Sequence, residues 1–170
     1  MRLRRLIVMR HAESPWEGVK APDHERPLGV VGRKQGPRVG AALVEKGWLP
    51  EIVLSSDAQR TRETFAGLSR AFAAEVEVRF LPSFYQFGQA AAEDEMVTLP
   101  ETVSCALLLG HNPGWEQLVE KLTGNAVAME PATAVVVSQE LNSWENAASA
   151  GRWELEDVIL PAPPHGGGET

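Results

Sequence analysis

Short apolar runs alternate along this chain with segments that have the spacing of amphipathic helices. Six runs predict strands, over residues 3–9, 51–56, 76–82, 103–110, 133–141 and 151–160. Helical spacing lies between them, in the stretch that ends at Gly47 and over residues 57–72, 86–99 and 112–124. Strands that alternate with helices favour a parallel sheet covered on both faces. We therefore predict an α/β fold, with three layers (α/β/α) around a mostly parallel central sheet.

The length of the chain predicts one domain. A chain of 170 residues can bury a full hydrophobic core, and the strands and helices predicted above place this domain over residues 1–160. The last ten residues, "PAPPHGGGET" (161–170), carry proline and glycine with nothing to bury. This composition predicts a disordered tail.

Charge, cysteine content and the amino end narrow the classes of partner and location. A formal net charge of −7 argues against sequence-independent binding to nucleic acid or to an anionic membrane surface. The single Cys105 cannot form an internal disulfide, so nothing marks an oxidising compartment. The apolar stretch Leu6–Met9 is too short for a signal peptide or a membrane span. We predict a cytoplasmic protein that binds neither nucleic acid nor membrane.

Prolines and glycines punctuate two of the predicted helices and the first loop. Pro37 lies in the helical stretch before Gly47, so that helix either begins near Pro37 or bends there. In the helix over 112–124, Asn112 can cap the amino end, Pro113 suits the first position and Gly124 ends it. Residues 12–29 form a long loop with three prolines, and loops of that length are typically functional or disordered.

Polar side chains follow three of the predicted strands. The first strand ends in Arg10 and His11, Arg60 lies in the first turn after the second, and the fourth is followed by His111 and Asn112. In open α/β sheets, ligands bind beyond the carboxyl ends of the strands, where these side chains would meet. Guanidinium groups match phosphate oxygens, and a helix start adds N–H donors and partial positive charge. The sequence therefore predicts a pocket that holds a phosphoryl group without a metal ion.

Four segments, "MRHAESPW", "DHERPLGVVGRKQGPRVG", "VLSSDAQRTRET" and "LLLGHNPGWEQLV", carry a family resemblance. In this order, and at these places in the α/β pattern, they resemble the histidine phosphatase superfamily, and within it the short SixA-like phosphohistidine phosphatases. The resemblance spans residues 3–160, and its signature is the pair Arg10-His11 followed by Ala12. It implies a phosphoglycerate mutase-like fold and no cofactor or metal.

The resemblance also implies roles for individual residues. His11 would be the nucleophile and would form a phosphohistidine intermediate. Arg10, Arg60 and His111 would bind the phosphoryl oxygens and stabilise charge in the transition state. Arg26, in "DHERPL", matches an Arg-Pro-Leu motif and would line the pocket. Neutral imidazole is a competent nucleophile, and nearby arginines should lower its pKa from about 6.5.

The general acid is open between two carboxylates. Asp23 matches an aspartate before Arg-Pro-Leu in the SixA-like group and is the first choice, while Glu13 is second because it lies close to His11 in sequence. We expect Glu13, Arg26 and Asn112 to contact substrate. An imidazole leaving group is far less basic than an alkoxide, so a phosphohistidine substrate relaxes the need for an acid. We find no obvious catalytic glutamate in the middle of the chain, which favours N-linked phosphate.

Competing readings concern Asp57, Arg62 and the histidines. Asp57 stands where the family usually has proline, and at a helix start we expect it to cap. Arg62 rivals Arg60, but the two point roughly 200° apart on a helix and the motif favours Arg60. A metal site is disfavoured, because the adjacent residues of "DHE" (23–25) cannot easily share one ion and two arginines would repel it.

These observations predict a metal-independent phosphatase that acts on phosphohistidine in a protein partner, such as a phosphotransfer or phosphocarrier protein, through a covalent phosphohistidine intermediate. The chain lacks the insertions that larger members use to enclose small metabolites, so an open cleft that admits a protein is expected. The alternatives are a small-molecule phosphomonoesterase and a phosphate-binding regulatory module without turnover.

Overall fold

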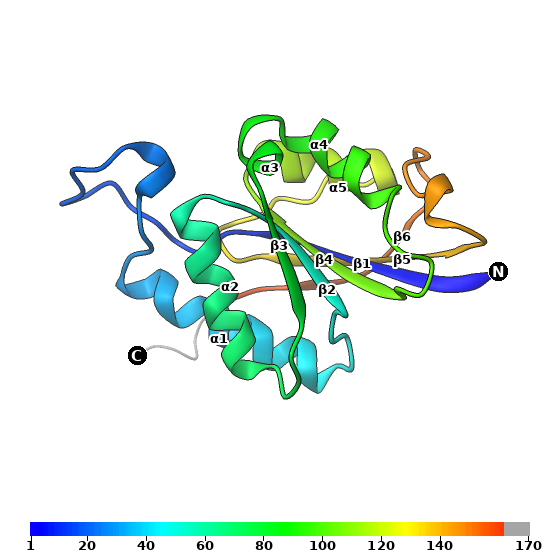
Figure 1. The fold of residues 1–170 in the computed structure, drawn as a ribbon, viewed down its shortest axis with the longest axis horizontal. Coiled ribbons are helices and arrows are strands. Elements are labelled where there is room, and N and C mark those ends of the chain that lie inside the picture. The colour runs from blue at the N-terminus through cyan, green and yellow to red at the C-terminus, as the bar shows by residue number, and fades with distance from the viewer. Residues whose placement is uncertain (162–170) are drawn as a thin grey trace.

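The computed structural model describes residues 1–161, which form a single sheet with helices on both faces (Figure 1). The strands are β1 (Arg2–Arg10), β2 (Ile52–Ser56), β3 (Glu77–Leu81), β4 (Cys105–Gly110), β5 (Ala134–Leu141) and β6 (Glu154–Ile159). The α-helices are α1 (Val30–Glu45), α2 (Gln59–Ala71), α3 (Pro82–Gln86), α4 (Gly88–Met96) and α5 (Gly114–Thr123). Two 3-10 helices are η1 (Asp23–Glu25) and η2 (Trp144–Asn146). The predicted tail, 161–170, falls outside the described residues except for its first position.

The sheet has the strand order β3-β2-β4-β1-β5-β6. β3, β2, β4 and β1 run parallel, β5 is antiparallel to β1, and β6 is antiparallel to β5. Arg10 pairs with Gly110 at the carboxyl ends of β1 and β4, and Ser55 of β2 pairs with Leu109. The mostly parallel sheet is therefore confirmed, and the ends of three strands meet at one edge.

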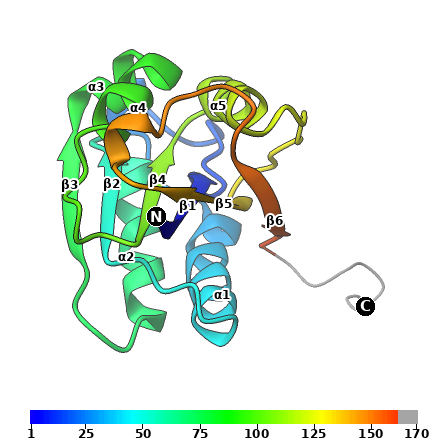
Figure 2. The same cartoon turned by 90° about the vertical axis from the view of Figure 1, so that its right-hand side faces the viewer.

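Alternate residues of the central strands supply two cores, one on each face of the sheet. On β1, Leu6 and Val8 belong to the core under α4 and α5, whereas Ile7 and Met9 belong to the core under α1 and α2. Figure 2 shows these helices on opposite sides of the strands. Because every residue from Leu6 to Met9 is fully buried, β1 reads as a continuous apolar run, as expected for a strand covered on both faces.

Helix α1 is continuous through Pro37, so the proline neither begins nor ends it. It begins at Val30, where the preceding Gly29 is the N-cap residue. Glycines on both helices let α1 and α2 approach closely: a Cβ on Gly67 of α2 would lie 2.8 Å from Pro37 Cδ, and one on Gly36 would lie 3.0 Å from the Thr64 carbonyl oxygen. Gly36, and Gly40 one turn later, therefore serve the packing of α1 against α2.

Two helix predictions need correction. The helix expected over 86–99 is α4, which begins at Gly88 with φ +52° and ends at Met96, and the short α3 that precedes it was not predicted. In α5, Pro113 and not Asn112 stands at the N-cap position, but the Asn112 Oδ1 still accepts the backbone N–H of Glu116 in the first turn at 3.3 Å. The expected end of α5 at Gly124 is confirmed, with φ +79°.

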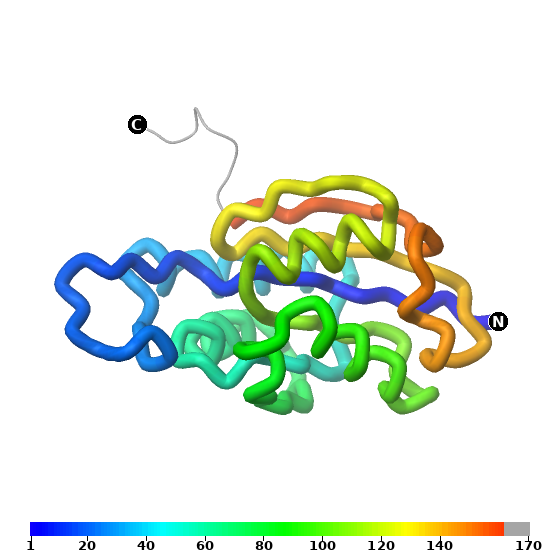
Figure 3. Tube along the Cα trace, turned by 90° about the horizontal axis from the view of Figure 1, so that it is seen from above, coloured from blue at the N-terminus to red at the C-terminus, as the bar shows by residue number. Residues whose placement is uncertain are grey.

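The loop between β1 and α1 projects from the end of the molecule opposite the amino terminus (Figure 3). Its start is fixed on α1: the Glu13 carbonyl accepts the Gly29 N–H at 3.0 Å, and the Glu13 N–H donates to the Gln35 side chain at 2.9 Å. A Cβ on Gly32 would lie 2.1 Å from the Glu13 carbonyl oxygen, so a glycine is required there. Within residues 1–161, no helix has the length and apolar character to cross a membrane.

Candidate active site

His11 is held at the carboxyl edge of the sheet by backbone hydrogen bonds on both sides. Its N–H donates to the Gly110 carbonyl at 3.0 Å, and its carbonyl accepts the Ala132 N–H at 2.9 Å. Ala132 is fully buried with φ +68°, a left-handed conformation that costs a residue with a Cβ on the order of 1 kcal/mol. The surrounding structure thus enforces the hydrogen bond between Ala132 and His11, and this hydrogen bond fixes the backbone position from which the His11 imidazole extends.

The tautomer of His11 follows from one hydrogen bond. Nδ1 lies 2.7 Å from the Ala12 carbonyl oxygen, which can only accept, so Nδ1 carries the proton and Nε2 carries the lone pair. Burial, together with the charges of Arg60, Arg10 and Arg26, lowers the pKa of His11 to about 4 against the opposing effect of that hydrogen bond. His11 is therefore neutral at physiological pH, with Nε2 available as a nucleophile.

Three arginines surround this imidazole. Arg10 donates to the Met129 carbonyl at 2.9 Å, and Arg26 donates to the Ser14 carbonyl while its guanidinium lies 4.6 Å from the centre of the Trp16 ring. Arg60 is nearly buried, with a side chain 7% exposed. All three Nε atoms are buried without a protein partner in the described part of the chain. Such guanidinium groups retain donors for an incoming oxyanion.

Asp23 bridges two of these arginines. Its Oδ1 accepts from Arg26 at 3.1 Å, and its Oδ2 accepts from Arg60 at 3.1 Å and from the Tyr85 hydroxyl at 2.7 Å. Burial alone would raise the pKa of Asp23, but these hydrogen bonds and the charge of Arg60 together lower it to about 2. In this arrangement Asp23 is an anion held by the guanidinium groups, so it would have to acquire a proton before acting as the predicted general acid.

His111 lies beside His11, with ring centres 5.2 Å apart. Burial, with smaller contributions from His11 and Arg60, lowers the pKa of His111 to about 3. Its Nε2 lies 2.8 Å from Ser56 Oγ, which also accepts the Ala58 N–H at 3.1 Å. Nδ1 of His111 is buried without a protein partner among residues 1–161. If the Ser56 hydroxyl donates to Nε2, then Nδ1 carries a proton for a phosphoryl oxygen.

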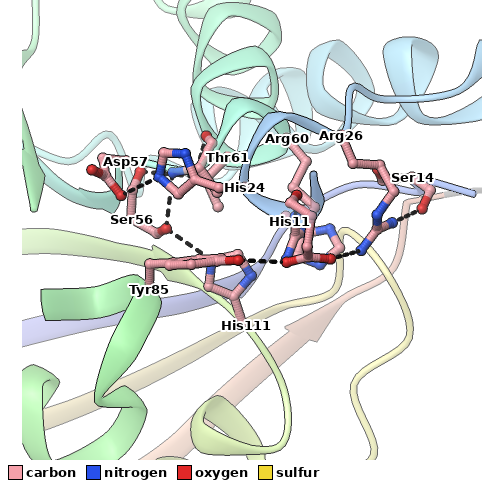
Figure 4. A network of polar contacts seen from close by, with 12 residues as sticks. His11, Ser14, His24, Arg26, Ser56, Asp57, Arg60, Thr61, Tyr85 and His111 are labelled. Carbon is pink, nitrogen blue, oxygen red and sulfur yellow. Dashed lines mark hydrogen bonds and ion pairs between the residues drawn. The ribbon is translucent and has the colours of Figure 1, made fainter. Parts of the chain in front are cut away.

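A cavity of about 310 Å3, the phosphoryl pocket, joins most of the residues that the sequence predicts for the site. Its lining comprises Arg10, His11, Glu13, Ser14, Pro15, Arg26, Arg60, His111, Asn112 and Pro131. Asp23 is the one predicted residue outside this lining, but it contacts Arg26 and Arg60. Asn112 lies at the rim, with its Nδ2 committed to Glu116 and to the Met129 carbonyl. Figure 4 shows the polar contacts around His11 and His111.

Tyr85 and Ser56 are the contributors that sequence reasoning did not assign to the site. Tyr85, in α3, presents its ring edge to His24 at 4.7 Å and to His111 at 5.6 Å between ring centres. It follows the carboxyl end of β3, so the rule that gathered Arg10 and His111 also applied to it. Ser56 occupies the same edge at the end of β2, where its Oγ contacts His111 Nε2.

The rival residues of α2 take other roles. Arg62 lies 4.3 Å from the centre of the Phe80 ring and donates to the Asp57 carbonyl at 2.9 Å, so Arg60 alone of the pair reaches the pocket. The expectation that Asp57 caps α2 is wrong: Ala58 is the N-cap residue, and the Asp57 carboxylate lies 2.8 Å from His24 Nε2. Among residues 1–161, no three His, Cys, Asp or Glu side chains are placed to hold a metal ion.

Comparisons with known proteins agree with this geometry. A family model for the histidine phosphatase superfamily, branch 1, matches residues 6–86. An uncharacterized chloroplastic protein of Arabidopsis thaliana is 36% identical over 171 residues, covering 93% of this chain and 78% of the relative. An uncharacterized protein of Mycobacterium leprae is 29% identical and covers 91% of this chain and 97% of the relative.

Solved structures with the same fold include proteins of the SixA group. One from Nakamurella multipartitia, provisionally assigned as a phosphohistidine phosphatase, is 28% identical with a TM-score of 0.78, covering 96% of this chain and 99% of that one. A similarly assigned protein from Agrobacterium tumefaciens has a TM-score of 0.80 at 23% identity, covering 93% of this chain and 98% of that one. A protein histidine phosphatase, SixA, solved with tungstate has a TM-score of 0.75 at 20% identity, covering 92% of this chain and 97% of that one.

Proposed function

This chain belongs to the histidine phosphatase superfamily, and we propose that it hydrolyses phosphohistidine in a protein partner through a phosphohistidine intermediate on His11. The observation that carries the proposal is a neutral imidazole, with Nε2 as its free nitrogen, in a pocket lined by Arg10, Arg26 and Arg60. That combination supplies a nucleophile and an anion site together. It suits phosphoryl transfer, in which catalysis is mostly positioning and charge stabilisation.

The first step of the proposed reaction is attack by His11 on the phosphoryl group. The Nε2 lone pair forms a bond to phosphorus while the bond from phosphorus to the substrate imidazole breaks. The departing nitrogen keeps the bonding pair and takes up one proton from solvent, which the second step returns. Arg10, Arg26 and Arg60 stabilise the charge on the three phosphoryl oxygens. His111 can add a donor through Nδ1, the atom that is buried without a partner.

The second step returns the enzyme to its starting state. A water molecule attacks the phosphorus of phospho-His11 in line with the bond to Nε2, which breaks and restores neutral His11. The products are inorganic phosphate and a proton released from the attacking water. The arginines meet the same charge in both steps, so one pocket serves both displacements.

The state of Asp23 supports an N-linked substrate over an ester. An alkoxide leaving group needs a protonated acid, but the pKa of Asp23 is lowered to about 2 in this site. An imidazole leaves as a much weaker base, so catalysis does not depend on proton donation by Asp23. We place the reaction in the cytoplasm, on the basis of the sequence, and propose no metal, because the three guanidinium groups already neutralise the phosphoryl oxygens.

A substrate screen tests this function. Wild type and His11→Ala should be compared on a histidine-phosphorylated phosphocarrier protein, a phosphotransfer domain and an aryl phosphate. The proposal expects wild-type turnover of a phosphohistidine protein, loss of at least about 10³-fold in His11→Ala, and an acid-labile phosphoryl group trapped on His11 after rapid quenching. Turnover of the ester alone would identify a phosphomonoesterase, and phosphate binding without turnover would identify a regulatory module.

A further inference from the structure

A second cavity, of about 440 Å3, adjoins the phosphoryl pocket and has a different chemistry. We call it the α3–α5 pocket; it is lined by Phe84, Tyr85, Gln86, Phe87, Gly88, Gln89, Ala90, His111, Asn112, Pro113, Gly114 and Gln117. His111 and Asn112 line both cavities. A substrate whose phosphoryl group lies against His11 therefore has direct access from one cavity to the other.

The two cavities differ sharply in charge. The phosphoryl pocket contains Arg10, Arg26, Arg60 and Glu13, whereas none of the twelve residues of the α3–α5 pocket is Asp, Glu, Lys or Arg. His111, the only titratable imidazole there, is neutral because burial lowers its pKa to about 3. A substrate that carries a carboxylate or a second phosphate beside its phosphoryl group would find no cation in this cavity. Moving that second charged group from water into a cavity without a cation costs free energy, and an uncharged group avoids this cost.

The lining offers amides and one exposed aromatic ring. Phe87, between α3 and α4, is 64% exposed, which is unusual for a side chain of this size. Gln86 and Gln117 have no side-chain hydrogen bond within the described residues, whereas Gln89 is engaged by Glu93. Primary amides can pair with the N–H and C=O groups of a polypeptide, and an exposed aromatic ring supplies apolar contact area.

Backbone packing fixes the shape of this cavity. Gly88 at the start of α4 and Gly114 at the start of α5 are in near contact, since a Cβ on Gly114 would lie 3.0 Å from the Gly88 Cα. Tyr85 forms the wall toward the phosphoryl pocket, because its hydroxyl reaches Asp23 while its ring packs edge-on against His111. The cavity is thus built from helix ends and held open, rather than from a loose surface loop.

We propose that the α3–α5 pocket binds an uncharged stretch of polypeptide that flanks the phosphohistidine of the partner protein. This proposal rests on the proposed function and deepens it by naming what lies beyond the scissile bond. Three observations carry the proposal. Within residues 1–161, the two cavities are continuous, the second is lined by no formally charged residue, and its lining combines the amides of Gln86 and Gln117, which have no hydrogen bond, with the exposed ring of Phe87. It disfavours small phosphoesters that carry a carboxylate, such as phosphorylated hydroxy acids and amino acids.

Matched substrates separate the two cavities. Phosphoramidate carries a P–N bond and no organic group, so it fills only the phosphoryl pocket. A histidine-phosphorylated phosphocarrier protein carries the same bond with its flanking polypeptide. In Phe87→Ala and Gln117→Glu, kcat/KM for the phosphoprotein should fall about 10-fold, mainly through KM, while kcat/KM for phosphoramidate stays within about 2-fold of wild type.

Control variants make the same chemical changes elsewhere. Leu155→Ala truncates an exposed apolar side chain on the edge strand β6, and Asn125→Asp adds a negative charge just beyond the other end of α5. In both control variants, kcat/KM for phosphoramidate and for the phosphoprotein should equal the wild-type value. The proposal is overturned if Phe87→Ala and Gln117→Glu lower kcat/KM equally for phosphoramidate and for the phosphoprotein, or lower it for neither substrate.

A third substrate, a phosphate ester with an uncharged alkyl group, tests whether the cavity instead binds the leaving group of a small molecule. If its KM rises in Phe87→Ala while that of the phosphoprotein does not, the cavity binds a small-molecule leaving group and the proposal is wrong. A different result, seen already in wild type, would refute the proposed function itself: turnover of phosphoramidate or of the ester, but of no phosphohistidine protein. Wild-type turnover of the phosphoprotein with unchanged variants refutes this inference alone.

Discussion

The Asp23 carboxylate competes with phosphate for the same guanidinium groups, so Asp23→Asn should tighten binding of inorganic phosphate. Asp23 accepts hydrogen bonds from both Arg26 and Arg60. A phosphoryl group that takes these donors must displace the carboxylate or lie against it. Either event costs free energy that an asparagine, with no formal charge, does not demand.

The magnitude follows from the pKa of Asp23. Lowering it from 3.8 to about 2 corresponds to roughly 2.5 kcal/mol of favourable interaction at about 1.4 kcal/mol per unit. The side chain is 43% exposed, so solvent screening leaves about half of this, on the order of 1 kcal/mol. Released in the variant, that energy should lower the inhibition constant for inorganic phosphate about 5-fold. The same interaction stabilises the fold above about pH 4 and is lost as the pH falls through about 2.

Product inhibition measures this effect directly. The inhibition constant of inorganic phosphate should be determined at neutral pH for wild type, Asp23→Asn and Asp57→Asn, with calorimetric titration as a second readout. Asp57→Asn is the matched control, because it removes a nearby carboxylate that contacts His24 and no arginine side chain. An unchanged or larger constant in Asp23→Asn would refute the reasoning and would mean that Asp23 orients the arginines for phosphate.

Three further predictions concern the neutral histidines and their support. His11 must be neutral to attack, and its pKa is about 4. In the pH profile of kcat/KM, once the substrate's own ionisation near pH 6 is fitted, the fall in activity on the acid side should therefore be centred near pH 4. A fall that is due to the enzyme and centred near pH 6.5 would contradict this. Ser56→Ala removes the partner of His111 Nε2 and should lower kcat about 10-fold with little change in KM; an unaltered kcat would deny Ser56 a positioning role. A Cβ on Gly110 would lie 2.5 Å from the Trp115 ring, so Gly110→Ala should lower the free energy of unfolding in urea by about 1–3 kcal/mol, and an unaffected midpoint would show that the indole can shift.

The sheet and its catalytic edge were predictable because they follow from local patterns. Buried strands are written as continuous apolar runs, and parallel strands bring their carboxyl ends to one edge, which places Arg10 and His111 at the same edge of the sheet. The pairing of β1 with β4, which sets Arg10 beside Gly110, comes from the structure. The helical period also separates Arg60 from Arg62, since only one of two residues 200° apart can face a given site. These inferences need no knowledge of side-chain conformation.

The loop and the mouth of the site were not predictable in the same way. The position of Asp23 depends on Arg60, 37 residues later, and on Tyr85, 62 residues later. No local pattern encodes such contacts. The break at Phe87 between α3 and α4, which the sequence did not predict, has a similar origin, because α4 begins where Gly88 meets Gly114 of α5. The α3–α5 pocket depends on that break and so was also invisible in the sequence.

Burial lowers the pKa of Arg10 as it lowers those of His11 and His111, but the outcome for the two kinds of group differs, and the proposed chemistry depends on that difference. A guanidinium keeps its proton even when nearly buried, as Arg60 is, because its ordinary pKa is above 12. An imidazole with an ordinary pKa near 6.5 loses its proton under the same burial, as His11 and His111 do. One environment therefore yields fixed positive charge for the phosphoryl oxygens and a free lone pair for the phosphorus. In a solvated site the guanidinium charge would be screened and the imidazole partly protonated, so the proposed reaction depends on the burial of this edge.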